Sequence, residues 1–544
     1  MELINQEAKV LMEGCKIKAR SSGLKFDNET LEYIVTNQNI LRLSPKIMIP
    51  TMYDYWVHGI RVNQEQEMYK HYPSNPYETV INTRPAVSFY NDNNPDWLNV
   101  MIFYHVLGHI DFFQNNVFFK HTWDDDFMAI ANSDKIVIDR IRRQLGEKKR
   151  YVDYVIEFIR ALDNLVGYYK EMNKENEPQA QSKLDFFFGQ FLRENSNSQK
   201  WIEFTNKYNE KIKTFGEKRG NKEFFHDIKS EFPEFEEFYK KYKKEYKGNE
   251  DLDIISFIMN HSDFLKKEEN GWMKEVMEIV RRTSLYFQPQ IRTKIINEGW
   301  ASYWHQELFE KDPMLSTNEV IYSRVNSGVM TMPKVGLNPY ALGYKLICFI
   351  EDLANKGKLS KEFDRTLDTK ERMKYDKKTG MGRSFIFHIR ENFNDFMLLN
   401  FLSKENFQDF VRQNKLWITD KVFNEERRSW IYYIKSKKGE DYRKMVIDGL
   451  YHPPHIEVGQ KKDGTLYIEH MFEGKPLHTP YIDGVLRGTE FLWGQPVALE
   501  TTEFEVDQNS VTKNQYDPTS PIKYKPIRVL YLMKNGKLAR RVKN

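Results

Sequence analysis

Two histidines that are four residues apart, His105 and His109, lie in an unusually apolar stretch of this sequence. Four residues are about one turn of an α-helix, so both imidazoles project from the same face and can converge on one ion. Neutral imidazole binds zinc, iron and manganese well. Because such a pair also arises by chance in a chain with 13 histidines, the alternative is two buried, hydrogen-bonded core residues.

A second segment, residues 296–305, carries a carboxylate and another histidine. Glu298 is a candidate third ligand of a divalent metal, with zinc favoured, if the two segments meet in space. Two histidines and one carboxylate would leave an open position for water. His305 lies two helical turns further on, about 10 Å along the axis. It is therefore predicted to bind a second metal, to support a ligand, or to act on the substrate as a catalytic acid or base.

The residue after the first histidine is a departure from known peptidase chemistry. In the motif His-Glu-x-x-His this position holds the general base, but here it is Val106. The standard peptidase mechanism therefore lacks its base.

Asp163 is a further catalytic candidate. Residues 151–170 are predicted to form an amphipathic helix, and Asp163 lies in the middle of its apolar stripe. Burying a lone carboxylate is costly, so this side chain needs a metal, a histidine or an arginine as its partner.

Length and composition restrict the class of protein. A chain of 544 residues exceeds the usual size of one hydrophobic core. The 82 basic and 78 acidic residues give a net charge of +4, which is weak support for nucleic-acid binding. Two cysteines make no disulfide framework. With no signal peptide and no membrane-spanning apolar run, we expect a cytoplasmic protein.

The pattern of apolar residues predicts a mainly α-helical N-terminal region with a buried helical core and an α+β C-terminal region. We divide the chain into a helical metal-binding domain at 1–385, with a peripheral charged helical insertion at about 171–250, and a C-terminal domain with a β-rich tail at 386–544. A helix apolar on all sides begins at Asp96. Other predicted helices cover 28–35, 271–287, 290–310 and 339–355, and extended segments cover 78–82 and 85–89.

Longer segments resemble two known families. Asn297-Glu298-Gly299-Trp300-Ala301 resembles the helix on which gluzincin metallopeptidases carry their third ligand, so a gluzincin-like arrangement is one expectation. Over residues 40–500 the chain resembles the stage V sporulation protein R (SpoVR) family. The segments that carry the resemblance are 105–116, 77–82, 286–294, 297–301, 338–343 and 390–395. Ile110 and Gln114 depart from the family pattern.

The resemblance implies a bacterial cytoplasmic protein tied to spore cortex formation, and so to peptidoglycan, or to stress response. It also implies a PrkA-type serine kinase and a von Willebrand-like protein as partners. Two hypotheses follow. One is a metal-dependent hydrolase acting on a peptidoglycan-related substrate. The other is a non-enzymatic regulatory or scaffold protein that works with the kinase system.

Overall fold

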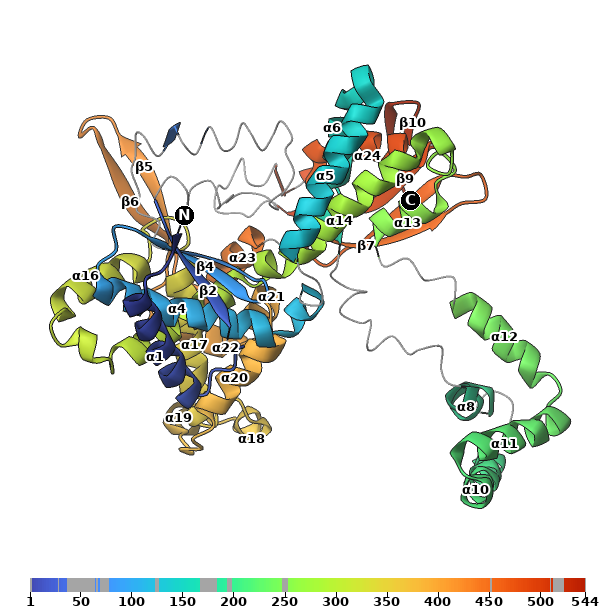
Figure 1. Cartoon of the computed structure of the whole chain (residues 1–544), viewed down its shortest axis with the longest axis horizontal. Coiled ribbons are helices and arrows are strands. Elements are labelled where there is room, and N and C mark those ends of the chain that lie inside the picture. The colour runs from blue at the N-terminus through green and yellow to red at the C-terminus, as the bar shows by residue number, and fades with distance from the viewer. Residues whose placement is uncertain are drawn as a thin grey trace. The chain divides into compact units, whose positions relative to one another are not determined.

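The computed structural model describes residues 2–27, 29–36, 64, 67–68, 78–122, 127–166, 183–192, 198–246, 253–450, 453–508, 510–511 and 523–543. The chain forms two compact units, one from residues 1–166 with 261–544 and one from residues 167–260 (Figure 1). The predicted charged insertion at 171–250 falls within the second unit. The expected fold class is confirmed, since a mainly helical N-terminal region precedes an α+β C-terminal region.

A small sheet forms near the N-terminus, with strand order β1-β2-β4-β3. The predicted pair of extended segments is present as β3 and β4, but the helix predicted at 28–35 is wrong. Residues 30–35 form a strand, β2, that pairs in parallel with β4, because the β-prone run Tyr33-Ile34-Val35 fits a half-buried sheet. The elements are β1 (Glu2–Leu3), α1 (Gln6–Ser21), β2 (Thr30–Val35), β3 (Glu78–Ile81) and β4 (Ala86–Asn91).

Three helices form the centre of the core, α4 (Asp96–Asn115), α15 (Lys294–Phe309) and α17 (Pro339–Asn355). α15 packs against both of the others. Close approach depends on glycine, since a Cβ atom on Gly108 would lie 2.8 Å from the Cα atom of Ala301. Likewise, a Cβ atom on Gly343 would lie 2.8 Å from the Cα atom of Gly299. These contacts bring the backbones of the three helices together.

The first unit contains further helices, of which α16, α20 and α21 contact α15 or α17 and α6 packs against α14. α6 ends ten residues earlier than predicted, and α14 runs through Pro289, where the sequence predicts a stop. α20 contains the predicted domain boundary at 385 and packs on α17. These helices are α5 (Phe127–Leu145), α6 (Arg150–Arg160), α14 (Gly271–Arg292), α16 (Glu319–Met330), α18 (Lys361–Arg365), α19 (Thr369–Lys374), α20 (Gly382–Asn392), α21 (Asp395–Phe401) and α22 (Lys404–Gln413). The 3-10 turns are η1 (Val117–Thr122), η2 (Gly146–Lys149), η3 (Asp163–Leu165), η6 (Glu268–Asn270) and η7 (Pro313–Leu315).

The C-terminal region contains a two-stranded hairpin and a five-stranded sheet of order β11-β10-β9-β8-β7. The predicted turn at Lys462-Asp463-Gly464 joins β7 to β8, and Gly464 has the positive φ that such a turn requires. The elements are β5 (Ile418–Asn424), β6 (Ser429–Ser436), α23 (Gly439–Gly449), β7 (His455–Gln460), β8 (Leu466–Met471), α24 (Thr479–Trp493), β9 (Val497–Val506), β10 (Tyr524–Lys534) and β11 (Lys537–Val542).

The second unit has an aromatic core of its own, in which Phe187 lies at the centre of a cluster of phenylalanine rings. Its elements are α8 (Lys183–Phe186), the π-helical segment η4 (Phe187–Phe191), α10 (Ser198–Phe215), α11 (Glu217–Glu231) and α12 (Phe235–Tyr246), and α13 (Ile254–His261) leads back to the first unit. Across the described ranges of both units, no helix combines the length and apolar character needed to cross a membrane.

Candidate metal centre

The candidate centre lies between α4, which carries His105 and His109, and α15, which carries Glu298. The start of α15 is held by a buried carboxylate. Asp395 of α21 accepts the backbone N–H groups of Ile295 and Ile296, each at 2.9 Å. Because the first N–H groups of a helix have no partner within it, Asp395 fixes α15 one turn before Glu298.

The ligand atoms of His105, His109 and Glu298 all lie within 4.8 Å of one another. The two Nε2 atoms are 3.1 Å apart, and Glu298 Oε2 lies 3.5 Å from His109 Nε2 and 3.9 Å from His105 Nε2. Zinc–nitrogen bonds of about 2.0–2.1 Å place two ligand nitrogens about 2.9–3.4 Å apart. The geometry is therefore suitable for one shared ion.

The Nδ1 atom of each of the two clustered histidines faces a polar group behind the ring. His109 Nδ1 lies 2.9 Å from Asn297 Oδ1. Because that oxygen can only accept, His109 carries its proton on Nδ1, and its Nε2 holds a lone pair. His105 Nδ1 lies 3.0 Å from His305 Nδ1, and His305 Nε2 lies 3.1 Å from Asn326 Oδ1.

The orientation of Asn326 decides the proton positions along this second chain. Its Nδ2 donates to the Tyr322 hydroxyl at 3.4 Å, so its oxygen is the atom that faces His305. His305 then donates from Nε2 to Asn326 and accepts at Nδ1 from His105. His105 also hydrogen-bonds to the backbone of Ala301. The Nε2 atoms of His105 and His109 face each other at 3.1 Å, a separation that suits a cation shared between them.

Burial favours the uncharged form of each of these groups. Loss of hydration lowers the pKa of His105 well below 6.5 and lowers the pKa values of His109 and His305 to about 4. Burial raises the pKa of Glu298 to about 7, although the Tyr340 hydroxyl hydrogen-bonds to it. Glu298 Oε2 has no hydrogen-bond partner. A buried oxygen in this state is costly, and a bound cation would satisfy it.

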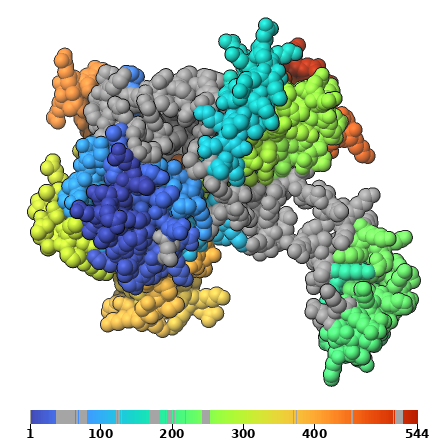
Figure 2. Space-filling view, in the orientation of Figure 1, coloured from blue at the N-terminus to red at the C-terminus, as the bar shows by residue number. Residues whose placement is uncertain are grey.

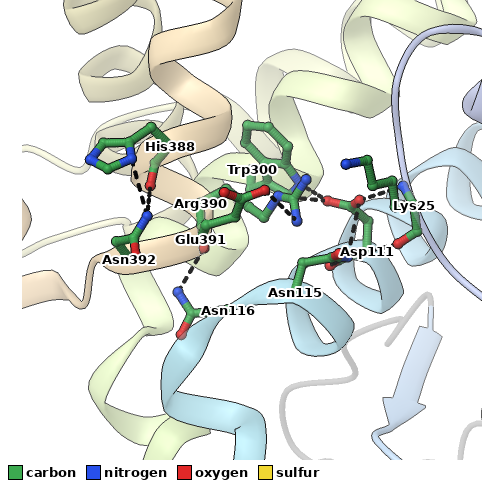
Figure 3. A network of polar contacts seen from close by, with 9 residues as sticks. All are labelled: Lys25, Asp111, Asn115, Asn116, Trp300, His388, Arg390, Glu391 and Asn392. Atoms are coloured by element: carbon green, nitrogen blue, oxygen red, sulfur yellow. Dashed lines mark hydrogen bonds and ion pairs between the residues drawn. The ribbon is translucent and has the colours of Figure 1, made fainter. Parts of the chain in front are cut away.

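A buried polar network next to the centre connects α4, α15 and α20 (Figure 3). Trp300 Nε1 donates to Asp111 Oδ2 at 2.8 Å, and Arg390 Nε lies 3.3 Å from the same oxygen. The other oxygen of Asp111 accepts the Lys25 backbone N–H at 2.7 Å. Asp111 and Trp300 each follow a candidate ligand by two residues, so their bond fixes α4 against α15 beside the centre.

The other two predicted site residues have different surroundings. His305 contacts His105, so it lies directly behind a candidate ligand. Asp163 is outside the group of clustered ligand atoms found among the described residues. It begins η3, and its Oδ2 lies 3.9 Å from Arg160 Nη1. The sequence predicts a metal, a histidine or an arginine as the partner of Asp163, and the structure places an arginine there. Burial raises the pKa of Asp163 to about 7.

Sequence reasoning missed five residues that support the centre. Asn297 directly precedes Glu298, and a polar residue beside a candidate ligand is the signal that could have found it. The Tyr340 ring stacks on the His105 ring, with centroids 5.9 Å apart. Tyr340, Arg390 and Asp395 occur in the segments that resemble the SpoVR family, but no spacing rule assigns them a role. No sequence signal identifies Asn326.

Comparison with known proteins agrees with the resemblance. Residues 5–450 match the family described as SpoVR like protein. The chain is also 22% identical over 337 residues to uncharacterized protein YcgB of Escherichia coli (strain K12). That match covers 58% of this chain and 57% of YcgB, so it spans little more than half of the relative's length. No solved structure matches the chain at a significant level. Because the family match includes most of the chain and all three clustered side chains, this protein belongs to the SpoVR family.

Proposed function

We propose that this protein is a metal-dependent hydrolase in which His105, His109 and Glu298 hold one divalent ion, with zinc as the preferred metal. The observation that carries the proposal is the pair of Nε2 atoms 3.1 Å apart beside a buried Glu298 oxygen that has no hydrogen-bond partner. A cation would bridge the two nitrogens and satisfy the oxygen. Three protein ligands leave room for water or substrate, as in catalytic rather than structural zinc sites.

A divalent ion in this position supplies Lewis acidity toward a carbonyl group and lowers the pKa of water. The protein's own residues prepare the centre. Asn297 and His305 hold the imidazoles in the tautomers that can bind a cation, and Tyr340 orients the Glu298 carboxylate. Since both nitrogens of His305 are occupied, we assign it as a positioning residue. Asp163 is paired with Arg160 and has no role in this proposal.

The substrate that we propose is an amide or peptide-like bond in a peptidoglycan-related molecule. The support is the chemistry of a Lewis-acid centre together with the link of the SpoVR family to the spore cortex, or to stress response in bacteria that form no spores. We also propose a cytoplasmic location, which the scarcity of cysteine favours.

The alternative is a regulatory or scaffold protein that acts with a PrkA-type serine kinase and a von Willebrand-like partner. The observation in its favour is Val106, which is fully buried and occupies the position of the peptidase general base. In that case the same three ligands would hold a structural ion, and the protein would bind metal without hydrolytic activity.

Elemental analysis of protein purified without a metal-binding tag tests the proposal. We expect about one divalent ion per chain in the native protein and its loss in His105→Ala and Glu298→Ala. His388→Ala is the matched control, because His388 is an exposed histidine of α20. Sub-stoichiometric metal that does not change in the three variants would refute the metal centre. If metal is present, hydrolysis of peptidoglycan fragments that is lost with the metal separates the enzyme from the scaffold.

A further inference from the structure

The β5–β6 hairpin exposes an unusual amount of apolar surface. Trp430 and Tyr433 are 51% and 48% exposed, and their neighbours along β6 are similarly open to solvent. Figure 2 shows the hairpin, in orange, projecting at the edge of the molecule. The large apolar residues exposed on it are Val422, Phe423, Trp430, Ile431, Tyr432, Tyr433 and Ile434. A contiguous apolar patch of this kind marks an interaction surface.

The base of the hairpin is fixed, so the exposed strands do not result from a loose attachment. Leu416, just before β5, is buried in the core at 3% exposure. Just after β6, Gln408 of α22 accepts the Gly439 N–H at 2.7 Å and donates to the Lys437 carbonyl at 3.3 Å. The hairpin therefore extends from a firm base as a sheet of two strands, which is marginal by itself in water.

The pairing register determines which side chains share a face. Phe423 lies opposite Trp430, with ring centroids 5.3 Å apart, and Lys421 lies opposite Tyr432. Val422 lies opposite Ile431 on the other face. Within the described part of the chain, no strand pairs with the outer edge of β6. Along β6 both faces carry large apolar side chains, and the charged residues Asp420 and Lys421 lie on β5. The outer edge of β6 therefore has backbone groups without a strand partner among the described residues.

We propose that the outer edge of β6 pairs with β6 of a second copy of this chain, in antiparallel orientation and centred on Tyr432. Each Tyr432 then lies opposite its own counterpart. Ile431 lies opposite Tyr433 of the second copy, and Trp430 lies opposite Ile434 of the second copy. Aromatic and β-branched residues are favourable cross-strand partners. The result is a four-stranded sheet, and the two-fold axis makes the interface closed and self-complementary.

The charges on the two strands explain the choice of edge. β5 carries Asp420 and Lys421 in its middle, and charged residues there protect an edge strand from pairing. β6 has no charged residue from Ser429 to Ile434, and Lys435 would lie opposite the uncharged Ser429 of the second copy. No like charges meet across the β6 pair, so a second copy fits this edge better than it fits the edge of β5.

Oxidative cross-linking tests the register. Residues directly opposite each other on antiparallel strands have Cα atoms about 4.5–5.5 Å apart, which is within the range for a disulfide. Tyr432→Cys should therefore give a covalent dimer. Trp430→Cys should not, because its counterpart is displaced by four residues along the strand, and Val422→Cys on β5 should not either. Equal cross-linking of Tyr432→Cys and Trp430→Cys would overturn the proposed register.

Sedimentation of the full-length protein tests the association itself. We expect a dimer that dissociates on dilution, a monomer for Tyr432→Lys, which places two like charges opposite each other, and a retained dimer for Val422→Lys. Thermal unfolding of both variants checks that each is folded. A wild-type protein that sediments as a monomer at every concentration would overturn the proposal, as would a Tyr432→Lys variant that stays dimeric.

Discussion

His109 Nδ1 and Asn297 Oδ1 lie 2.9 Å apart, across the interface of α4 and α15. Through this hydrogen bond, Asn297 determines which ring nitrogen of His109 carries the proton. Asn297 directly precedes Glu298, another candidate ligand. The geometry of the centre therefore depends on groups that cannot themselves bind the ion. That dependence can be measured.

Asn297→Ala removes the acceptor behind His109, so the ring can move its proton to Nε2, where it blocks metal binding. We expect metal affinity to fall by about 10–100-fold, the usual effect of losing such a partner, in competition titrations with a chromophoric chelator. Asn392→Ala is the matched control, because Asn392 also contacts a histidine, His388, but on α20. Equal affinities in the two variants would contradict this role for Asn297.

Gly108→Ala places a Cβ atom 2.8 Å from the Cα atom of Ala301, a backbone atom that cannot move aside easily. We expect a loss of about 1–3 kcal/mol in the free energy of unfolding, together with weaker metal binding, because α4 and α15 must separate. Gly14→Ala is the control. A Cβ atom there meets nothing within 4 Å, so the variant should gain up to about 1 kcal/mol from helix propensity. Similar stabilities in urea unfolding would argue against the tight helix contact.

Arg390→Leu leaves the Asp111 carboxylate buried without its cationic partner, since both side chains are fully buried. We expect the free energy of unfolding to fall by about 3–5 kcal/mol. Asp111→Asn together with Arg390→Leu should recover part of that loss, because no charge then remains in the pocket. Arg487→Leu removes an exposed ion pair with Asp483 and should cost at most about 1 kcal/mol. If the double variant is no more stable than Arg390→Leu, the buried pair is not coupled.

His470 makes the C-terminal sheet sensitive to acid. Burial, with the nearby Arg528, lowers its pKa to about 4, below the value of about 6.5 in an unfolded chain. Between these values the unfolded state binds more protons, so stability is full above pH 6.5 and is lost as the pH falls toward 4. When the pH falls from 7.5 to 5, the free energy of unfolding should decrease in both proteins. We expect the decrease to be about 1–2 kcal/mol smaller for His470→Gln than for the wild type. Urea unfolding at both pH values checks this, and equal losses would contradict it.

The sequence by itself identified the three clustered side chains and the fold class. The spacing of His105 and His109 is a local property, because one helical turn places them on one face whatever the rest of the chain does. The all-round apolar character of residues 96–113 likewise predicts a central helix. Local signals were weaker where neighbouring strands decide the outcome. Residues 30–35 were predicted to form a helix, but pairing with β4 makes them a strand.

Only the tertiary structure decided which hydrogen-bond partners and which degree of burial the three clustered side chains have. Asn326 and His105 are far apart in the chain, and only the packing of α16, α15 and α4 joins them through His305. The same is true of Arg390 with Asp111, and of Asp395 with the start of α15. Asp163 shows the same dependence, since α6 ends at Arg160 and the guanidinium of that residue lies 3.9 Å from the Asp163 carboxylate. Periodicity reports which face a residue occupies, whereas proton positions and burial depend on contacts between segments that only the folded chain brings together.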